Sequence, residues 1–303
     1  MDFPETISLI WNSKKDWEVK FSNEPILSSK YYINTVKLRN INKELQIYGK
    51  IQYNPINNIS QTKMKKIYNK TLLKSNLQKC IRRGRVDEAL ITALNLIHVD
   101  FLHFIRRIII ISIEDVGITD NLPFLVWLLI AYPNYEISNE FIQFLLLTVY
   151  SLCIHKTKYN PTSANNNLDY KKIDYSNIYK LSLLIREEYG GMKGDMKLIH
   201  SFINSFDIPI IKVKIGNLVL TRDITKNDIL LESIDFHCYP DMLEYIKKET
   251  GIDEHTIKLQ IWNNNSKYNF REKSYTIKSV IWEKISEVVK FFQIMKKNSI
   301  YIK

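Results

Sequence analysis

Two long apolar runs in the middle of the chain constrain its fold more than any other feature. Leu122–Tyr132 is almost wholly apolar, and Phe141–Ile154 is interrupted by the polar residues Gln143, Thr148 and Ser151. The first run is too short to span a bilayer, and the second is too polar to do so. Both runs therefore predict buried helices of a soluble protein, and we expect no membrane partner.

Apolar residues recur at helical spacing on both sides of these runs, a pattern typical of amphipathic helices. Gly84 is a stop signal after the first such helix, and Asp87 and Glu88 suit the positive end of the next helix dipole. We expect one helix to begin at Asp87 and others to cover 60–83, 101–113, 122–131, 138–155, 178–188, 242–250, 253–262 and 279–297.

Alternating apolar and polar residues predict two β-hairpins. The first turns near Asn40–Lys43, and the second, over Ile208–Leu220, turns at Gly216–Asn217. Because helices outnumber these strands, the expected fold class is mainly α, a helical bundle with small β-hairpins at its periphery. Trp262, near the end of a predicted helix, is expected to anchor the core.

Length and composition indicate how the chain divides. The 303 residues are enough for two ordinary domains, and Lys156–Ser176 is polar, as is typical of an exposed loop. We expect an N-terminal mixed β region over 1–60, a helical domain over 61–158, a loop or linker over 159–176 and a C-terminal helical domain with a hairpin over 177–303. Met1–Glu5 lacks the basic start of a secretory signal, so we expect an intracellular protein.

A basic segment ahead of the apolar runs is the main indication of function. From Leu45 to Val86 the chain has ten Lys and Arg residues and no acid, while the whole chain carries a net charge of +11. Cations that neutralise phosphates release counterions, so such a segment binds nucleic acid through its backbone, without sequence preference. The expected nucleic-acid-binding residues are Lys63, Lys65, Lys66, Lys70, Lys74, Lys79, Arg82, Arg83 and Arg85. The alternative is a solvated lysine face balanced by acids elsewhere in the fold.

Residues 77–159 contain a series of short motifs. Lys79–Arg82 and Asp87–Leu90 are followed by Arg106-Arg107 and, after an apolar turn, by Glu114–Gly117. The series resembles the helical C-terminal region of the replication-associated recombination protein A family, AAA+ ATPases that include the Werner-helicase-interacting ATPase. The resemblance implies a helical collar or oligomerisation module in DNA replication or repair. Its implied partners are DNA rather than RNA, a second copy of the chain, or replication proteins.

The chain departs from this family in one large respect. No G-x-x-x-x-G-K-[ST] motif occurs anywhere in it, so the machinery that holds and hydrolyses ATP in a P-loop is missing. The first motif also departs, because Lys79 and Ile81 are separated by one residue fewer than in the family. The resemblance therefore supports a helical fold and a partner class, but not an ATPase activity.

The most specific part of the resemblance has a structural interpretation of its own. Arg106 and Arg107 precede Glu114 and Asp115 by two helical turns, which is too far for a direct pair on one helix. We expect both sets to pair across helices, as an ion-pair network that fixes the register of the helices. Contact of the arginines with phosphate, or a catalytic or ligand-sensing role, are the alternatives.

A second segment of interest is rich in glycine. Gly190, Gly191 and Gly194 are three of the eight glycines of the chain, and they surround Lys193. Consecutive amides in such a turn before a helix can cradle a phosphate, so these four residues are a candidate phosphate loop. In the other interpretation the segment is an ordinary turn, and Asp195 caps a helix over 196–206.

Candidate metal and catalytic residues are few. Cys80, Cys153 and Cys238 form no CxxC pair, which excludes a disulfide scaffold and makes a zinc ribbon improbable. Asp235 and His237 lie beside Cys238, but a zinc site needs four ligands and the sequence offers no second pair. We therefore expect packing at Asp235–Cys238, and we expect no metal, no cofactor and no catalytic residue.

The basic segment and the resemblance together favour a non-enzymatic nucleic-acid-binding or assembly factor in DNA replication, recombination or genome maintenance. Abundant Lys, Asn, Ile and Tyr are typical of an A/T-rich genome such as that of a virus. Two alternatives stay open. One is a protein-interaction scaffold, and the other is an enzyme that processes nucleic acid or nucleotides through Lys193, Asp195, Asp235 and His237.

Overall fold

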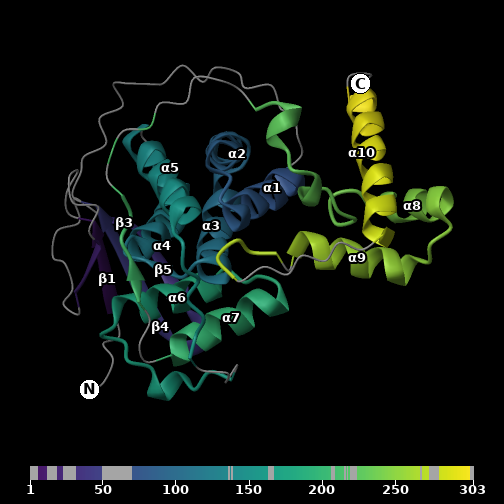
Figure 1. Cartoon of the computed structure of the whole chain (residues 1–303). Helices are drawn as coiled ribbons and strands as arrows, with labels where there is room; N and C mark the ends of the chain where they lie inside the picture. Colours follow the sequence, from purple (N-terminus) through teal and green to yellow (C-terminus); the bar gives the residue numbers. More distant parts are fainter. Residues whose placement is uncertain are drawn as a thin grey trace. The chain divides into compact units, whose positions relative to one another are not determined.

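The computed structural model confirms the mainly α-helical fold class (Figure 1). It describes residues 6–11, 19–22, 32–49, 70–135, 137, 139–162, 167–205, 209–214, 216, 218, 224–266, 268–272 and 280–300. None of the helices in these ranges combines the length and the apolar character that crossing a membrane requires.

The chain forms two compact units, each assembled from three separate segments. The first unit comprises Met1–Thr62, Ile105–Thr148 and Tyr159–Asn217, and the second comprises Lys63–Phe104, Val149–Lys158 and Leu218–Lys303. Two helices, α3 (Phe101–Asp115) and α5 (Asn139–Ile154), contribute residues to both units. This arrangement differs from the contiguous division expected from composition, because each unit draws on segments far apart in the sequence.

A four-stranded sheet belongs to the first unit. Its strands are β1 (Thr6–Trp11), β2 (Val19–Ser22), β3 (Tyr32–Leu38) and β4 (Lys43–Gly49), in the order β2-β1-β4-β3. The first predicted hairpin is confirmed, since β3 and β4 are antiparallel and Asn42 adopts the left-handed conformation between them, at φ 51°. The sheet is larger than a hairpin, because β1 pairs with β2 antiparallel and with β4 parallel.

The core of the first unit includes α4 (Leu122–Ala131), which packs against all four strands. Every residue of this helix is buried, as its apolar composition predicts. The Trp127 indole Nε1 donates to the Tyr48 carbonyl at 2.9 Å, so the largest buried side chain has a partner for its N–H group. The ring also stacks with Phe124, whose centroid lies 6.0 Å away.

The first unit also contains the helices α6 (Ile178–Glu188) and α7 (Lys193–Asn204). Within the second predicted hairpin the structure describes β6 (Ile210–Ile211), which pairs in parallel with β5 (Ile118–Thr119). A parallel partner from a distant segment leaves no sign in the local alternation of residues. Much of the predicted hairpin, including Asn217 in its turn and Val219 and Leu220 in its second strand, lies outside the described residues.

The second unit contains α1 (Lys70–Arg83) and α2 (Val86–Val99), with α8 (Met242–Thr250), α9 (Glu254–Ser266) and α10 (Val280–Ile300). Gly84 ends α1 at φ 67°, as predicted, and the ring of Phe270 lies against it. The expected core position of Trp262 is wrong, because this side chain on α9 is 51 % exposed. Its neighbour one position earlier, Ile261, takes the buried place.

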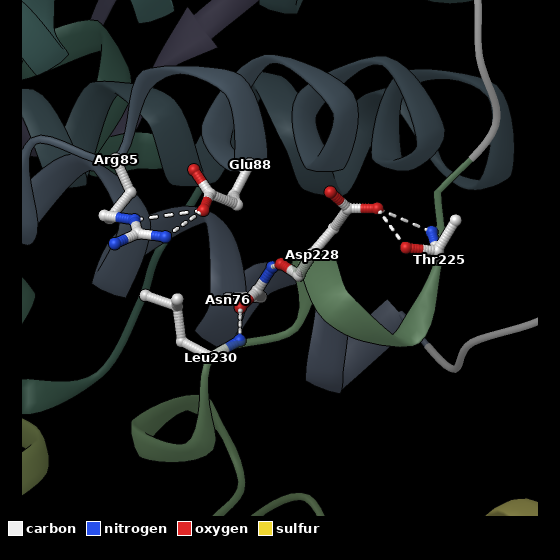
Figure 2. A network of polar contacts seen from close by, with 6 residues as sticks. All are labelled: Asn76, Arg85, Glu88, Thr225, Asp228 and Leu230. Atoms are coloured by element: carbon white, nitrogen blue, oxygen red, sulfur yellow. Dashed lines mark hydrogen bonds and ion pairs between the residues drawn. The ribbon is translucent and has the colours of Figure 1, made fainter.

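A buried asparagine fixes the segment after Ile224 to α1. The Asn76 Nδ2 atom donates to Thr92 Oγ1 at 2.8 Å and to the Asp228 carbonyl at 2.7 Å. Its Oδ1 atom accepts from the Leu230 amide at 2.9 Å and from Ser233 Oγ at 2.8 Å. All four hydrogen-bonding positions of the side chain are therefore used. Figure 2 shows this centre beside the Arg85–Glu88 ion pair.

Arg271 joins two helix ends in the same unit. Its guanidinium donates to the carbonyls of Ile81 at 3.0 Å and His155 at 2.7 Å, and also to that of Leu152. These carbonyls belong to, or directly follow, the C-terminal turns of α1 and α5, where the helix dipoles attract positive charge. The guanidinium also stacks on Phe270, 4.3 Å from the ring centroid.

Candidate anion-binding sites

The predicted nucleic-acid-binding residues of the basic segment fall into two groups. Lys63, Lys65 and Lys66 lie outside the described residues. The other six are on α1 or directly after it: Lys70, Lys74, Lys79, Arg82, Arg83 and Arg85.

Three of the six described cations have carboxylate partners from outside the acid-free segment. The Lys70 ammonium lies 3.2 Å from Asp100 Oδ2, and Arg83 Nε lies 3.3 Å from Glu232 Oε1. Arg85 pairs with Glu88 in the first turn of α2. Arg83 also donates to the Asn264 carbonyl at 2.8 Å, and its burial lowers its pKa from the ordinary arginine value.

The remaining three cations of α1 are also engaged within the chain. Lys79 and Arg82 are only 6 % and 4 % exposed, and Lys74 has contacts of its own. The described part of the basic segment therefore does not present an open cationic ridge. Lys70 and Arg83 of α1 instead reach carboxylates that lie outside α1 in the same unit. Nucleic-acid binding by this segment stays a prediction.

A different cluster gathers three arginines. We define the arginine turn as Arg106 and Arg107 of α3, Arg186 of α6 and residues 189–195, all in the first unit. Arg106 Nη2 donates to the Tyr189 carbonyl at 2.6 Å and, more weakly, to the Gly190 carbonyl at 3.4 Å. Arg186 donates from Nη1 to the same Gly190 carbonyl at 2.8 Å and from Nε to the Arg106 carbonyl at 3.2 Å.

The backbone of residues 189–195 follows from its glycines. Gly190 ends α6 at φ 65°, a left-handed conformation that favours glycine, and its amide donates to the Glu187 carbonyl at 2.7 Å. Helix α7 then begins at Lys193, so Gly194 is already helical. The expectation that Asp195 is the N-cap is corrected, because Asp195 lies inside the first turn and accepts from the Met192 amide at 3.4 Å.

The three arginines of the arginine turn have different kinds of partner. Arg107 Nη1 lies 3.8 Å from Asp195 Oδ2, whereas the hydrogen bonds of Arg106 and Arg186 to described residues all go to main-chain carbonyls. Arg186 is 3 % exposed. Burial, followed by the charge of Arg106, lowers the pKa of Arg186 to about 10, and Arg107 adds to this while Asp195 opposes it.

The described partners of the predicted ion-pair network can be stated for its arginines. Arg107 faces a carboxylate on another helix, Asp195, whereas Arg106 bonds carbonyls. Glu114 and Asp115 lie two turns further along α3, and Asp115 is buried. The structure brings the two arginines to the predicted phosphate loop, a proximity that no local pattern of residues predicts.

The loop Asp235–Cys238 has the geometry of a capped turn. Asp235 Oδ1 accepts from the amides of His237 at 2.9 Å and Cys238 at 3.3 Å, and the Cys238 thiol donates to the Ser233 carbonyl at 3.6 Å. Burial and the charge of Asp235 raise the pKa of Cys238 to about 12, so its thiol stays protonated. No group of three or more metal-ligating side chains occurs in the described ranges.

A polar cluster of Tyr170, Glu187 and His200 lies outside every candidate site that the sequence singles out. Glu187 Oε1 accepts from Tyr170 Oη at 2.9 Å and lies 2.7 Å from His200 Nε2, joining α6 to α7 and to the short helix Tyr170–Lys172. The other oxygen of Glu187 is buried without a hydrogen-bond partner. The three residues are spread over 31 positions in no recognisable motif, so no sequence signal could have identified the cluster.

Comparisons with known proteins identify no relative: no family model, curated protein or solved structure matches this chain. The resemblance of residues 77–159 to the recombination protein A family therefore stays a prediction.

Proposed function

We propose that this chain is a non-enzymatic nucleic-acid-binding or assembly factor that contacts backbone phosphates at the arginine turn. The observation that supports the proposal is the gathering of three arginines, Arg106, Arg107 and Arg186, at the turn that leads into α7. DNA as the partner, and replication, recombination or genome maintenance as the setting, rest on the resemblance of residues 77–159 alone.

The chemistry of the arginine turn suits phosphate oxygens. Guanidiniums bind phosphates through charge-assisted, often bidentate hydrogen bonds. The N-terminus of α7 adds the positive end of a helix dipole, and the exposed Lys193 and Lys197 extend the cationic surface along this helix. Lys63, Lys65 and Lys66 remain part of the proposal as further backbone contacts.

Fluorescence anisotropy with labelled single- and double-stranded DNA and RNA tests the proposal across a salt series. The variant K193Q/K197Q removes two exposed charges from the arginine turn and its helix. Affinity should fall, and the slope of log K against log salt should decrease by about one for each phosphate that the variant no longer neutralises. The matched control K171Q/K172Q removes two exposed lysines elsewhere in the same unit.

Two results would count against the proposal. The absence of binding at low salt to all four nucleic acids would remove the function itself. An equal loss in both double variants would mean that general positive charge attracts nucleic acid, with no role for the arginine turn.

A second candidate function is a protein-interaction scaffold, and exposed apolar side chains in the second unit favour it. Trp262 on α9 and Phe291 on α10 are 51 % and 53 % exposed, and Leu259 lies one helical turn from Trp262. Leu259 and Trp262 are neighbours on α9, and adjoining exposed apolar side chains of this kind are typical of protein-binding surfaces. Loss of pull-down partners in the variant W262S, with nucleic-acid binding unchanged, would favour the scaffold.

A further inference from the structure

We infer that helix α10 is a dimerisation surface, at which it pairs antiparallel with α10 of a second copy of the chain. This inference goes beyond the proposed function, because it needs neither nucleic acid nor the arginine turn. It rests on an exposed stripe of α10, along which apolar and charged side chains are arranged symmetrically.

One face of α10 is buried inside the second unit. Ile285, Val289 and Phe292 recur at helical spacing and are at most 3 % exposed. The helix packs against α8 and α9 (Figure 1), and the Phe292 ring centroid lies 5.6 Å from that of Tyr245 and 5.7 Å from that of Tyr239. The unit therefore covers this face of α10 with its own side chains.

The opposite side of α10 presents a short exposed stripe. At about 100° per residue, four exposed side chains fall within a sector of about 60°, on the far side of the helix from Val289. They are Val280, Lys284, Glu287 and Phe291. The two apolar side chains lie at the ends of the stripe, where Val280 is 81 % and Phe291 is 53 % exposed. Exposed apolar side chains rimmed by charged ones are typical of interaction sites.

The order of these side chains makes the stripe complementary to its own reverse. From one end to the other it runs apolar, Lys, Glu, apolar, with spacings of four, three and four residues. In an antiparallel pair with a twofold axis midway between positions 285 and 286, Val280 of one copy lies level with Phe291 of the other. Lys284 of one copy lies level with Glu287 of the other. The apolar ends therefore meet each other, and opposite charges meet in the middle.

The charges of the stripe also select the direction of the pairing. A twofold axis repeats each contact, so the antiparallel pair has two contacts of Val280 with Phe291 and two pairs of Lys284 with Glu287. Like charges of the two copies are then three positions apart, about 4.5 Å along the axis. A parallel pair in register would instead set lysine against lysine and glutamate against glutamate, which weakens binding.

The Lys284 side chain is already oriented within its own chain. Its ammonium donates to the Thr250 carbonyl at the end of α8, at 3.1 Å. An ammonium has three N–H donors, so this bond is compatible with a contact to Glu287 of the second copy. Because the carbonyl holds the long side chain, less rotamer entropy is lost when the pair forms.

Sedimentation velocity on the full chain, over a series of concentrations, tests for the dimer. F291S should raise the dissociation constant at least about tenfold, because it removes an apolar anchor that occurs twice in the interface. The matched control W262S removes an exposed aromatic side chain from α9 and should leave the constant unchanged. E287K should also weaken the dimer, whereas E249K, at an exposed acid of α8, should not.

A charge exchange tests the antiparallel register itself. K284E should weaken the dimer, and K284E/E287K should restore most of it, because the two charges trade places. An equimolar mixture of the K284E and E287K chains should form mixed dimers, since their charges complement each other. Thermal melts by circular dichroism identify any variant that fails to fold, which matters for K284E because it also loses the bond to Thr250.

Three results would overturn the inference. A wild-type chain that stays monomeric at millimolar concentration does not use α10 to dimerise. A dimer that W262S dissociates and F291S does not has its interface on α9. A well-folded K284E/E287K chain that recovers no dimer rules out the antiparallel pairing. None of these results bears on nucleic-acid binding at the arginine turn, which the K193Q/K197Q variant tests separately.

Discussion

Replacement of Asn76 by alanine should strongly destabilise the second unit. The substitution removes four hydrogen bonds at once and leaves the Leu230 amide and the Asp228 carbonyl without their partner. The hydroxyls of Thr92 and Ser233, which are fully buried, lose the same partner but can rotate. Each buried polar group left unsatisfied costs about 1–3 kcal/mol, so the two main-chain groups and the small cavity predict a loss of roughly 3–5 kcal/mol.

Urea unfolding followed by circular dichroism measures this loss, and hydrogen exchange at the Leu230 amide locates it. The matched control is N227A, which removes an exposed asparagine from the same segment and should change stability by less than about 0.5 kcal/mol. Ser233 and Asn76 share one hydrogen bond, which N76A already removes. S233A should therefore lower the free energy of unfolding much less in the N76A background than in the wild-type chain. A loss below about 1 kcal/mol in N76A, with unchanged exchange at Leu230, would refute the reasoning.

Three further results are expected. Burial raises the pKa of Cys153 to about 12, so at pH 8 this thiol should react with a disulfide reagent only after unfolding. The stability that the neutral thiol contributes should be lost as pH rises from about 9 towards 12. Burial and then the bond to Glu187 raise the pKa of Tyr170, so stability should fall above about pH 10, and Y170F should reduce this alkaline decline in a thermal melt. G84A should cost roughly 1–3 kcal/mol in urea unfolding, because φ is 67° and the added Cβ would lie 3.0 Å from Phe270; wild-type stability would contradict it.

Local sequence patterns predicted the helices and the hairpin whose structure is decided by residues close together in the sequence. The apolar run over Leu122–Ala131 became a wholly buried helix, and Ile178–Glu188 was predicted with the bounds observed. The β3–β4 hairpin was also predictable, because alternation and the turn at Arg39–Asn42 lie within one short stretch. In each case the residues that decide the structure lie within a few positions of one another.

Pairings between distant segments were not predictable in the same way. The parallel pairing of β1 with β4, and that of β5 with β6, joins segments separated by more than 30 residues. Nothing in the sequence predicted the structural roles of Asn76 and Arg271 either, because an isolated asparagine or arginine is usually a surface residue. Their importance comes from carbonyls and amides that only the folded chain brings to them.

The basic segment shows that a charge count along the sequence does not give the ion pairs of the folded chain. Three of its described cations, Lys70, Arg83 and Arg85, pair with acids that lie beyond the end of the acid-free stretch, namely Asp100, Glu232 and Glu88. In the arginine turn the situation is reversed, since Arg186 directly precedes Glu187 and Glu188 in the chain yet bonds main-chain carbonyls. Carbonyls orient a guanidinium without neutralising its charge, and the Arg186 side chain is almost wholly shielded from water. The groups that folding brings to a cation therefore decide its partner, and neighbouring residues in the sequence do not indicate which groups these are.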